Sequence, residues 1–280
     1  MKSVYSGKEK KMNILSEKNV NNGEIISKEQ LQNLLDNDNA KIYEVIRVIN
    51  RKPIFLKEHY ERMQESINLS KVEGNLDFDR YRKSVELLIA ENDFENCNIR
   101  VSYYYNNKEI VLFYFIESNY PSKKQFEEGV HTVTAKVQRH NPNVKAFQKD
   151  FKQKVQQIID ETNAFEAILI NEDDTVSEGS KSNIFFVKEK KLVTSPDSAV
   201  LLGVTRSKVI EVCESNGIVV ERRFIKLDEL DFFDGAFITG TSNDVLPIKS
   251  IDERVYNSAN NEVVKRAYEL YMDEVNKNFV

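Results

Sequence analysis

A short segment at residues 178–185 constrains this chain more than any other. It reads Glu-Gly-Ser-Lys-Ser-Asn-Ile-Phe, so that a carboxylate, a turn of small residues and an asparagine lead directly into an apolar strand. The apolar run at residues 165–170 predicts a buried strand just before it. Considered alone, Glu178 is either a solvated carboxylate at the end of a strand or a functional acid.

Two later segments carry groups that suit an anion. Residues 202–206, Leu-Gly-Val-Thr-Arg, form a loop-to-helix junction, where backbone amides and the helix dipole favour a phosphate. Residues 239–243, Thr-Gly-Thr-Ser-Asn, follow a strand and add hydroxyls and amides. Each segment alone also fits an ordinary helix start or a plain turn. Acid, amides and hydroxyls in this order suit a phosphorylated, nitrogen-containing ring, so a cofactor site is the leading hypothesis.

Composition narrows the classes of protein that remain. The 280 residues give room for one large or two modest domains, each with a buried core. A net charge of −5, with Lys and Arg scattered among acidic residues, gives no reason to expect nucleic acid. No apolar run reaches the roughly 18 residues of a membrane span, and residues 1–22 lack a signal-peptide core. We therefore expect small-molecule partners, and neither nucleic acid nor a membrane.

Cysteine and histidine usage argues against a disulfide framework and against a metal site. Cys97 and Cys213 are too few for a disulfide framework, and we expect reduced, structural thiols in a cytoplasmic protein. His59, His131 and His140 show no metal-ligand spacing with one another or with cysteine, so no metal site is expected.

Hydrophobic periodicity predicts an α+β unit up to about residue 120, then a polar connection and a second unit. Ser27 and Gln30 form a capping-box pattern that predicts a helix start. Thr205 is the predicted N-cap of a helix that ends before Gly217. Further helices are predicted at residues 60–67, 78–88, 147–158 and 264–275. Strands are predicted at residues 42–49, 54–56, 99–105, 109–116, 130–137, 165–170, 175–177, 184–187, 192–194, 218–220 and 236–239.

Two basic residues are candidates only through their relation to these segments. Lys145 lies between an irregular segment and an amphipathic helix, where its side chain can face a cleft. A partly desolvated lysine can act as a nucleophile, although most lysines are simply solvated. Arg62 follows His59 by three residues on one helix face, which by itself is typical of a surface patch.

Taken together and in order, these residues resemble the fold-type IV pyridoxal-phosphate enzymes, the class that holds branched-chain and D-amino-acid aminotransferases and 4-amino-4-deoxychorismate lyase. The resemblance runs from about residue 43 to residue 251. Residues 160–167 are similar to the lyases, whereas residues 43–45 and 58–62 are similar to the D-amino-acid aminotransferases.

The resemblance implies a two-domain α/β (α+β) enzyme that binds its cofactor between the domains and works as a homodimer. We expect a small N-terminal α+β domain at residues 1–120, an interdomain connection at residues 121–140, and a larger C-terminal domain at residues 141–280. The C-terminal domain would be β-barrel-like with flanking helices.

The resemblance also implies a role for each matching residue, with pyridoxal 5′-phosphate as the cofactor. Lys145 matches the Schiff-base lysine, which also serves as general base and acid, and Glu178 matches the acid facing the pyridine nitrogen. Tyr43 matches a tyrosine near cofactor and substrate. The phosphate would be bound by Arg62, Val204, Thr205 and Thr241 with Gly240 beside it, and Leu202 would pack on the ring.

Departures from the family pattern leave alternatives open. Lys149 is an alternative nucleophile, and Lys181 either binds an acidic substrate or points to solvent. Residues 37–40 replace a glycine-rich approach to the tyrosine. The Arg-Gly segment of many aminotransferases is missing after the first hairpin, where residues 100–103 run into Asn106 and Asn107, so the group that recognises the substrate carboxylate is not assigned.

The leading function is amino transfer between an amino acid and a 2-oxo acid. The alternatives are 4-amino-4-deoxychorismate lyase, which forms 4-aminobenzoate and pyruvate, and a non-catalytic protein that binds pyridoxal phosphate.

Overall fold

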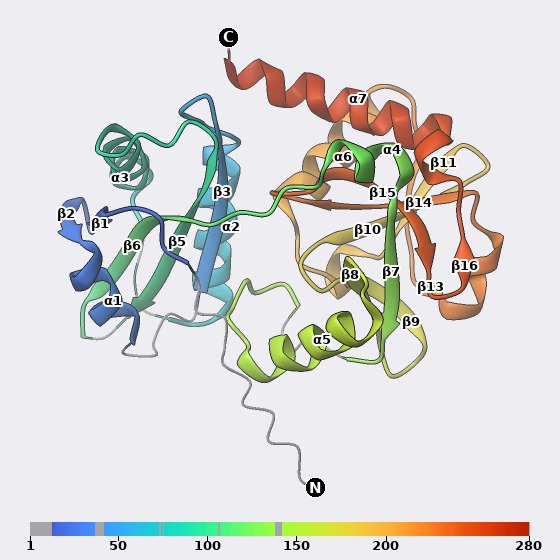
Figure 1. The fold of residues 1–280 in the computed structure, drawn as a ribbon, viewed down its shortest axis with the longest axis horizontal. Helices are drawn as coiled ribbons and strands as arrows, with labels where there is room; N and C mark the ends of the chain where they lie inside the picture. Colours follow the sequence, from blue (N-terminus) through green and yellow to red (C-terminus); the bar gives the residue numbers. More distant parts are fainter. Residues whose placement is uncertain are drawn as a thin grey trace, which may run out of the picture.

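A computed structural model describes residues 13–36, 42–72, 74, 76–105, 107–137 and 142–279. The expected loop at residues 37–40, Asn106 in the predicted hairpin turn, and His140 lie outside the described residues. Figure 1 shows two sheets, one formed by the N-terminal part of the chain and one by the rest, with helices packed around each.

The first sheet is antiparallel and, within the described residues, has six strands in the order β2-β1-β6-β5-β3-β4. Its strands are β1 (Lys18–Asn21), β2 (Glu24–Ser27), β3 (Ile42–Ile49), β4 (Lys52–Pro53), β5 (Cys97–Tyr105) and β6 (Glu109–Ile116). Along β3, alternate side chains are buried and half-buried. One face of the sheet is therefore fully covered, and the other is partly open.

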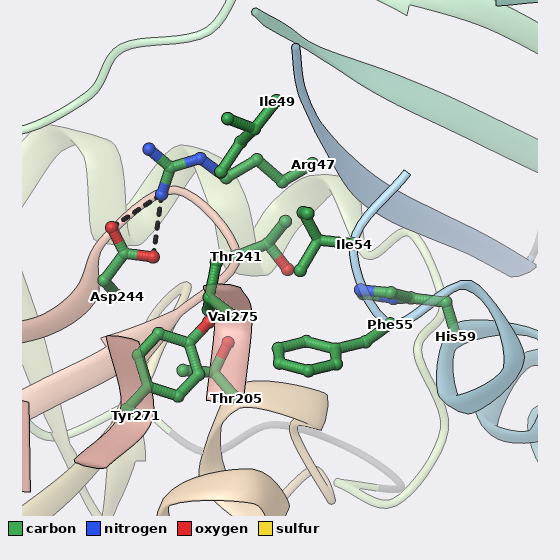
Figure 2. A pocket seen from close by; sticks show the side chains of 10 residues that line it. All are labelled: Arg47, Ile49, Ile54, Phe55, His59, Thr205, Thr241, Asp244, Tyr271 and Val275. Atoms are coloured by element: carbon green, nitrogen blue, oxygen red, sulfur yellow. Dashed lines mark hydrogen bonds and ion pairs between the residues drawn. The ribbon is translucent and has the colours of Figure 1, made fainter. Parts of the chain in front are cut away.

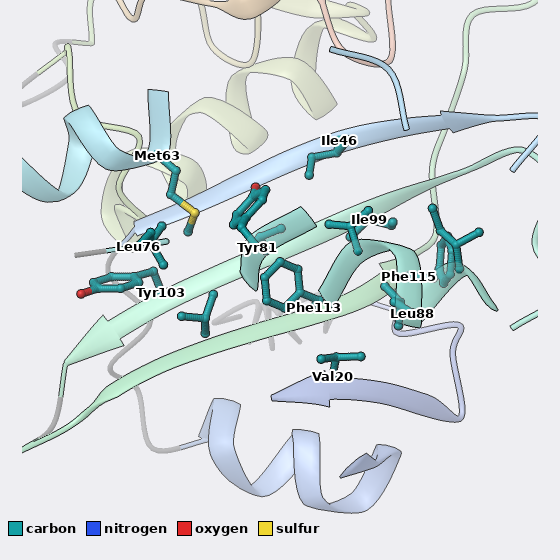
Figure 3. Close-up of a cluster of buried hydrophobic side chains, with 14 of the residues drawn as sticks. Val20, Ile46, Met63, Leu76, Tyr81, Leu88, Ile99, Tyr103, Phe113 and Phe115 are labelled. Atoms are coloured by element: carbon teal, nitrogen blue, oxygen red, sulfur yellow. The ribbon is translucent and has the colours of Figure 1, made fainter. Parts of the chain in front are cut away.

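Helices α2 (Leu56–Leu69) and α3 (Phe78–Ala90) cover one face of this sheet. Figure 3 shows Met63 and Tyr81 from these helices packed over Ile46, Ile99 and Phe113 from the strands. Helix α1 (Lys28–Asp36) packs Leu31 against the opposite face. The same face also carries Arg47 and Asn98, which contact the second sheet.

The second sheet is mixed and contains ten strands in the described part of the chain, in the order β12-β11-β10-β14-β15-β7-β8-β9-β13 with β16 paired to β15. The pairs β15–β7, β7–β8 and β11–β12 are parallel. Its strands are β7 (Val130–Ala135), β8 (Glu166–Ile170), β9 (Thr175–Gly179), β10 (Asn183–Lys188), β11 (Lys191–Thr194), β12 (Val220–Arg222), β13 (Ile225–Lys226), β14 (Gly235–Gly240), β15 (Asp244–Ile251) and β16 (Arg254–Val255).

Apolar side chains from strands across this sheet meet in one cluster, which requires the sheet to curve around it. Ile168 of β8, Phe186 of β10 and Leu246 of β15 all belong to this cluster. The outer face is covered by helices, since α6 (Val204–Ser215) and α7 (Glu262–Asn276) pack on Phe185 and Phe237. The helices are α4 (Lys123–Glu128), α5 (Lys149–Thr162), α6 (Val204–Ser215) and α7 (Glu262–Asn276), with short 3-10 turns at Asp197–Ala199, Leu227–Phe232, Ser258–Asn260 and Lys277–Phe279.

Polar contacts join the two sheets directly. Arg47 of β3 binds both carboxylate oxygens of Asp244 at 2.6 and 2.7 Å. Asn98 of β5 donates to Ser242 Oγ at 2.8 Å. These contacts end on Ser242 in the turn between β14 and β15 and on Asp244, the first residue of β15, so the first sheet holds that turn in place.

The mixed α/β architecture with two sheets is as the sequence predicts, and most elements agree in position. The capping box at Ser27 and Gln30 is present, with bonds in both directions.

No helix of the described residues is long and apolar enough to cross a membrane. Nor does the described part of the chain contain a His, Cys, Asp or Glu cluster suited to a metal ion.

Three local predictions are wrong. The partner of β3 is Lys52–Pro53 rather than residues 54–56, because Phe55 already adopts φ 51° ahead of α2. The connection after residue 120 contains α4, which begins with a Ser122–Gln125 capping box. Thr205 is not an N-cap, because Gly203 holds that position and Thr205 lies inside α6.

Candidate active site

Lys145 lies in an extended segment beside the start of β3. Its carbonyl accepts a hydrogen bond from the Tyr43 amide at 3.0 Å, and its own amide donates to Ser66 Oγ at 3.3 Å. The ammonium nitrogen is 5.1 Å from the centroid of the Tyr43 ring. Lys145 is half-buried, whereas Lys149, the first residue of α5, is exposed. This placement favours Lys145 over Lys149 as the nucleophile.

Tyr43 is surrounded by cations. The Arg100 guanidinium carbon is 4.0 Å from its ring centroid, and Lys152 Nζ of α5 is 5.2 Å away. Arg100 lies opposite Val45 in the β3–β5 register, so it shares the polar face of the sheet with Tyr43. Arg100 is 9% exposed, and its Nε has no hydrogen-bond partner among the described residues. A buried guanidinium of this kind suits an incoming carboxylate.

Glu44 points to the other side of β3, toward α2. It accepts from Arg62 Nε at 2.8 Å and Arg62 Nη2 at 2.5 Å, and lies 2.9 Å from His59 Nδ1. Burial alone would raise the pKa of Glu44, but Arg62 and His59 lower it to about 2. Burial lowers the pKa of His59. A neutral His59 therefore donates from Nδ1 to an ionised Glu44.

Glu178 is buried at the end of β9 and held by groups around the start of α6. Asn183 Nδ2 donates to Glu178 Oε2 at 3.0 Å, and the Leu201 amide donates to the same oxygen at 3.1 Å. Asn183 Nδ2 also donates to the Leu201 carbonyl at 2.8 Å. Both donors meet one oxygen, so they fix the orientation of the Glu178 carboxyl group.

The N-terminus of α6 is shaped for an anion. Its N-cap, Gly203, supplies no side-chain hydrogen bond to the first turn, which leaves those amides for a ligand in the described structure. Thr205 and Thr241 line one pocket with His59, as Figure 2 shows. The pocket is bounded on its other sides by Arg47, Ile49, Ile54, Phe55, Asp244, Tyr271 and Val275.

Hydrogen bonds connect the Lys145 segment to the Glu178 segment. Asn143 Nδ2 donates at 2.9 Å to the carbonyls of both Asp197 and Val200. Val200 immediately precedes Leu201, whose amide binds Glu178. The lysine and the acid therefore belong to neighbouring segments rather than to opposite surfaces of the molecule.

The remaining candidates lie at the ends of strands and at the start of α6. Lys181 is exposed in the turn between β9 and β10. Leu202 is half-buried next to Gly203, and Val204 is the first residue of α6. Gly240 ends β14, where a Cβ would meet its nearest neighbour at 3.6 Å, so space alone does not demand glycine there. At Gly203, by contrast, a Cβ would lie 2.2 Å from Asn183 Oδ1.

The donor set fits pyridoxal phosphate. A buried acid held by two hydrogen-bond donors, a half-buried lysine and a helix N-terminus without a side-chain cap match the ring nitrogen, the aldehyde and the phosphate of that molecule. Sequence reasoning missed Arg100, Glu44 and Asn183. Asn183 lies five residues after Glu178, and Glu44 is one of the residues that resemble the aminotransferases, but the sequence does not show which groups they contact.

Comparisons with known proteins show the family of this chain. The family described as Amino-transferase class IV matches residues 41–251. A probable branched-chain-amino-acid aminotransferase of Thermotoga maritima is 33% identical over 223 residues, which are 77% of this chain and 78% of that protein. The D-alanine aminotransferase of Bacillus licheniformis is 31% identical over 235 residues, 78% of this chain and 81% of that protein.

Solved structures with the same fold include related enzymes. A branched-chain amino acid aminotransferase from Thermobaculum terrenum, solved in its holo-form with pyridoxal phosphate, superimposes with a TM-score of 0.81 over 95% of this chain and 95% of that one, at 22% identity. A putative branched-chain amino acid aminotransferase from Thermotoga maritima gives a TM-score of 0.79 at 28% identity, covering 92% of this chain and 95% of that one.

Proposed function

This chain belongs to the class IV aminotransferase family, whose members use pyridoxal phosphate, and we propose that it transfers the amino group of a branched-chain or other small apolar amino acid to a 2-oxo acid. The observation that carries the proposal is the half-buried Lys145 beside Tyr43, in a segment bonded to the one that holds Glu178. Bound pyridoxal phosphate supplies an electron sink for negative charge at the substrate α-carbon.

The chain's own groups have separate tasks in this proposal. Lys145 would hold the cofactor, and its freed amine would then take the proton from the substrate α-carbon and return it to the carbon of the cofactor's aldehyde group. Glu178 keeps the ring nitrogen protonated. The amides of Val204 and Thr205 and the hydroxyls of Thr205 and Thr241 bind the phosphate together with Arg62. Leu202 packs on the ring, and Gly240 supports the Thr241 turn.

We assign recognition of the substrate carboxylate to Arg100. Its guanidinium lies over Tyr43, and its Nε lacks a partner within the described residues. Tyr43 would lie between this carboxylate and the cofactor. Lys181, exposed at the neighbouring turn, would bind a second carboxylate on an acidic acceptor.

We also propose that the enzyme is a cytoplasmic homodimer. Phe147, two residues after Lys145, is 44% exposed, and Leu69 at the end of α2 is 51% exposed. Apolar side chains at the rim of a site suit a subunit interface. Cys97 and Cys213 are buried and free, which agrees with a reducing compartment. The division at residues 1–120, 121–140 and 141–280 remains a proposal that limited proteolysis would test.

A donor and acceptor panel tests the function. The purified enzyme would be mixed with D- and L-amino acids, with 2-oxo acids and with aminodeoxychorismate, and conversion of the cofactor to its pyridoxamine form would be followed. We expect conversion by an apolar amino acid and its reversal by a 2-oxo acid. Release of pyruvate and 4-aminobenzoate without any conversion would favour the lyase, for which neither site nor comparisons give support. No reaction with any donor would favour a non-catalytic protein.

A further inference from the structure

Asn183 contacts both parts of the predicted cofactor site. Its amide nitrogen donates to Glu178 Oε2 at 3.0 Å and to the Leu201 carbonyl at 2.8 Å. The Leu201 amide completes the triangle by donating to the same glutamate oxygen at 3.1 Å. Asn183 is 4% exposed, so water does not compete for these bonds. One side chain therefore ties the acid at the end of β9 to the segment that enters α6.

The close approach of Gly203 makes this connection rigid. A Cβ at Gly203 would lie 2.2 Å from Asn183 Oδ1, so the backbone at the N-cap of α6 packs directly on the amide. The Gly203 amide also donates to the Leu201 carbonyl at 2.8 Å, which is the carbonyl that Asn183 binds. A shift of Asn183 would therefore move Glu178 and the start of α6 relative to each other.

We propose that Asn183 is a positioning residue that fixes the distance between Glu178 and the N-terminus of α6. The inference rests on the proposed roles of these groups toward the ring nitrogen and the phosphate. Because the bonded framework of the cofactor limits the separation of its nitrogen and phosphate, the protein must present its two partners at a matching separation. Asn183 does so without itself touching the cofactor.

The test uses the holoenzyme and the variants Asn183→Ala, Asn183→Asp and Glu178→Gln. The readouts are the ¹⁵N signal of the labelled ring nitrogen, the ³¹P signal of the phosphate, the Kd of the cofactor and the melting temperature of the apoprotein. Asn216→Ala is the matched control, because Asn216 makes one comparable bond, to the Val212 carbonyl at 2.8 Å, at the far end of the same helix.

We expect Glu178→Gln to move the ¹⁵N signal alone, and Asn183→Ala to move both signals and raise Kd at least ~10-fold. Asn183→Asp keeps the size of the side chain but places an oxygen against the Glu178 carboxyl group. It should therefore move both signals and raise Kd at least as much as Asn183→Ala does. Asn216→Ala should leave both signals in place.

Other results would overturn the inference in distinguishable ways. If Glu178→Gln leaves the ¹⁵N signal unchanged, the assignment of the acid fails and the inference falls with it. If Glu178→Gln behaves as expected but Asn183→Ala moves neither signal, or only the ¹⁵N signal, the positioning role alone is wrong. An Asn183→Asp protein that matches the wild type would contradict it even if Asn183→Ala does not fold.

Discussion

Glu44 and Arg62 form a two-point ion pair inside the first sheet and its helices. Arg62 Nε and Nη2 reach the two carboxylate oxygens at 2.8 and 2.5 Å, and the Glu44 side chain is fully buried. A planar guanidinium held at two points cannot rotate freely, which fixes the direction in which its third nitrogen points. The pair therefore fixes the orientation of Arg62 and satisfies the buried charge of Glu44.

Glu44→Gln should lower the free energy of unfolding by about 3 kcal/mol at pH 7, because it leaves a buried guanidinium without its counter-charge. The pKa of Glu44 is about 2 in the folded protein against 4.5 ordinarily, so the unfolded chain binds more protons between these values. The stabilisation is complete above about pH 4.5 and is lost as pH falls toward 2.

Urea unfolding of wild type and Glu44→Gln across this range measures the effect. The difference between the two proteins should narrow below pH 4.5. Glu91→Gln, which removes an exposed partner of Lys18, is the control and should leave the unfolding midpoint unchanged. A difference that stays constant down to the acid transition would contradict the assigned pKa.

Asp244→Asn should raise the Kd of the cofactor about tenfold. The effect would be indirect, because the Arg47–Asp244 pair holds the turn that carries Thr241. Asparagine tolerates the φ of 52° at this position, so backbone strain does not confuse the result. Fluorescence titration of the apoprotein gives Kd. In a double-mutant cycle with Arg47→Ala, additive effects would show that the pair is not the cause.

Arg100→Lys should raise the KM for amino acid and 2-oxo acid substrates at least ~10-fold, since a lysine cannot offer the two-point geometry of a guanidinium. Cofactor Kd should hardly change, because Arg100 contacts Tyr43 rather than the phosphate residues. Steady-state kinetics and cofactor titration separate the two effects. An equal fold increase in the KM for substrates and in the Kd of the cofactor would point to a general disturbance of the sheet.

Lys145→Ala should abolish turnover while the melting temperature of the apoprotein stays close to wild type, because the half-buried side chain contributes little packing. Lys149→Ala, at the exposed start of α5, is the control and should keep turnover near the wild-type value. Near-normal turnover in Lys145→Ala would refute the proposed role.

Much of the architecture could be predicted from local pattern. The alternation from Ile42 to Ile49 gives β3 to the residue, since a half-buried strand repeats every second position. Strand β15 was not among the predicted strands, and it contains Pro247, a residue that normally argues against a central strand. It is tolerated where the β15–β7 register shifts just beyond, between Ile248 and Ser250.

The site was less accessible to sequence reasoning, because its geometry comes from contacts between distant segments. The Thr205 cap was a reasonable local prediction, but the approach of Asn183 reserves the cap position for Gly203. Arg100 could not be placed until the register set it opposite Val45, two residues from Tyr43. The role of Glu44 likewise depends on a helix that packs behind its strand.

The central claim is that Lys145 carries the cofactor, and borohydride reduction of the holoenzyme followed by peptide mapping tests it most directly. The reduction makes the bond between lysine and cofactor permanent, so that mass spectrometry identifies the residue. The reduced pyridoxyl group is predicted on Lys145 alone. Its appearance on Lys149 or any other lysine, or on no residue of a protein saturated with pyridoxal phosphate, would contradict the account.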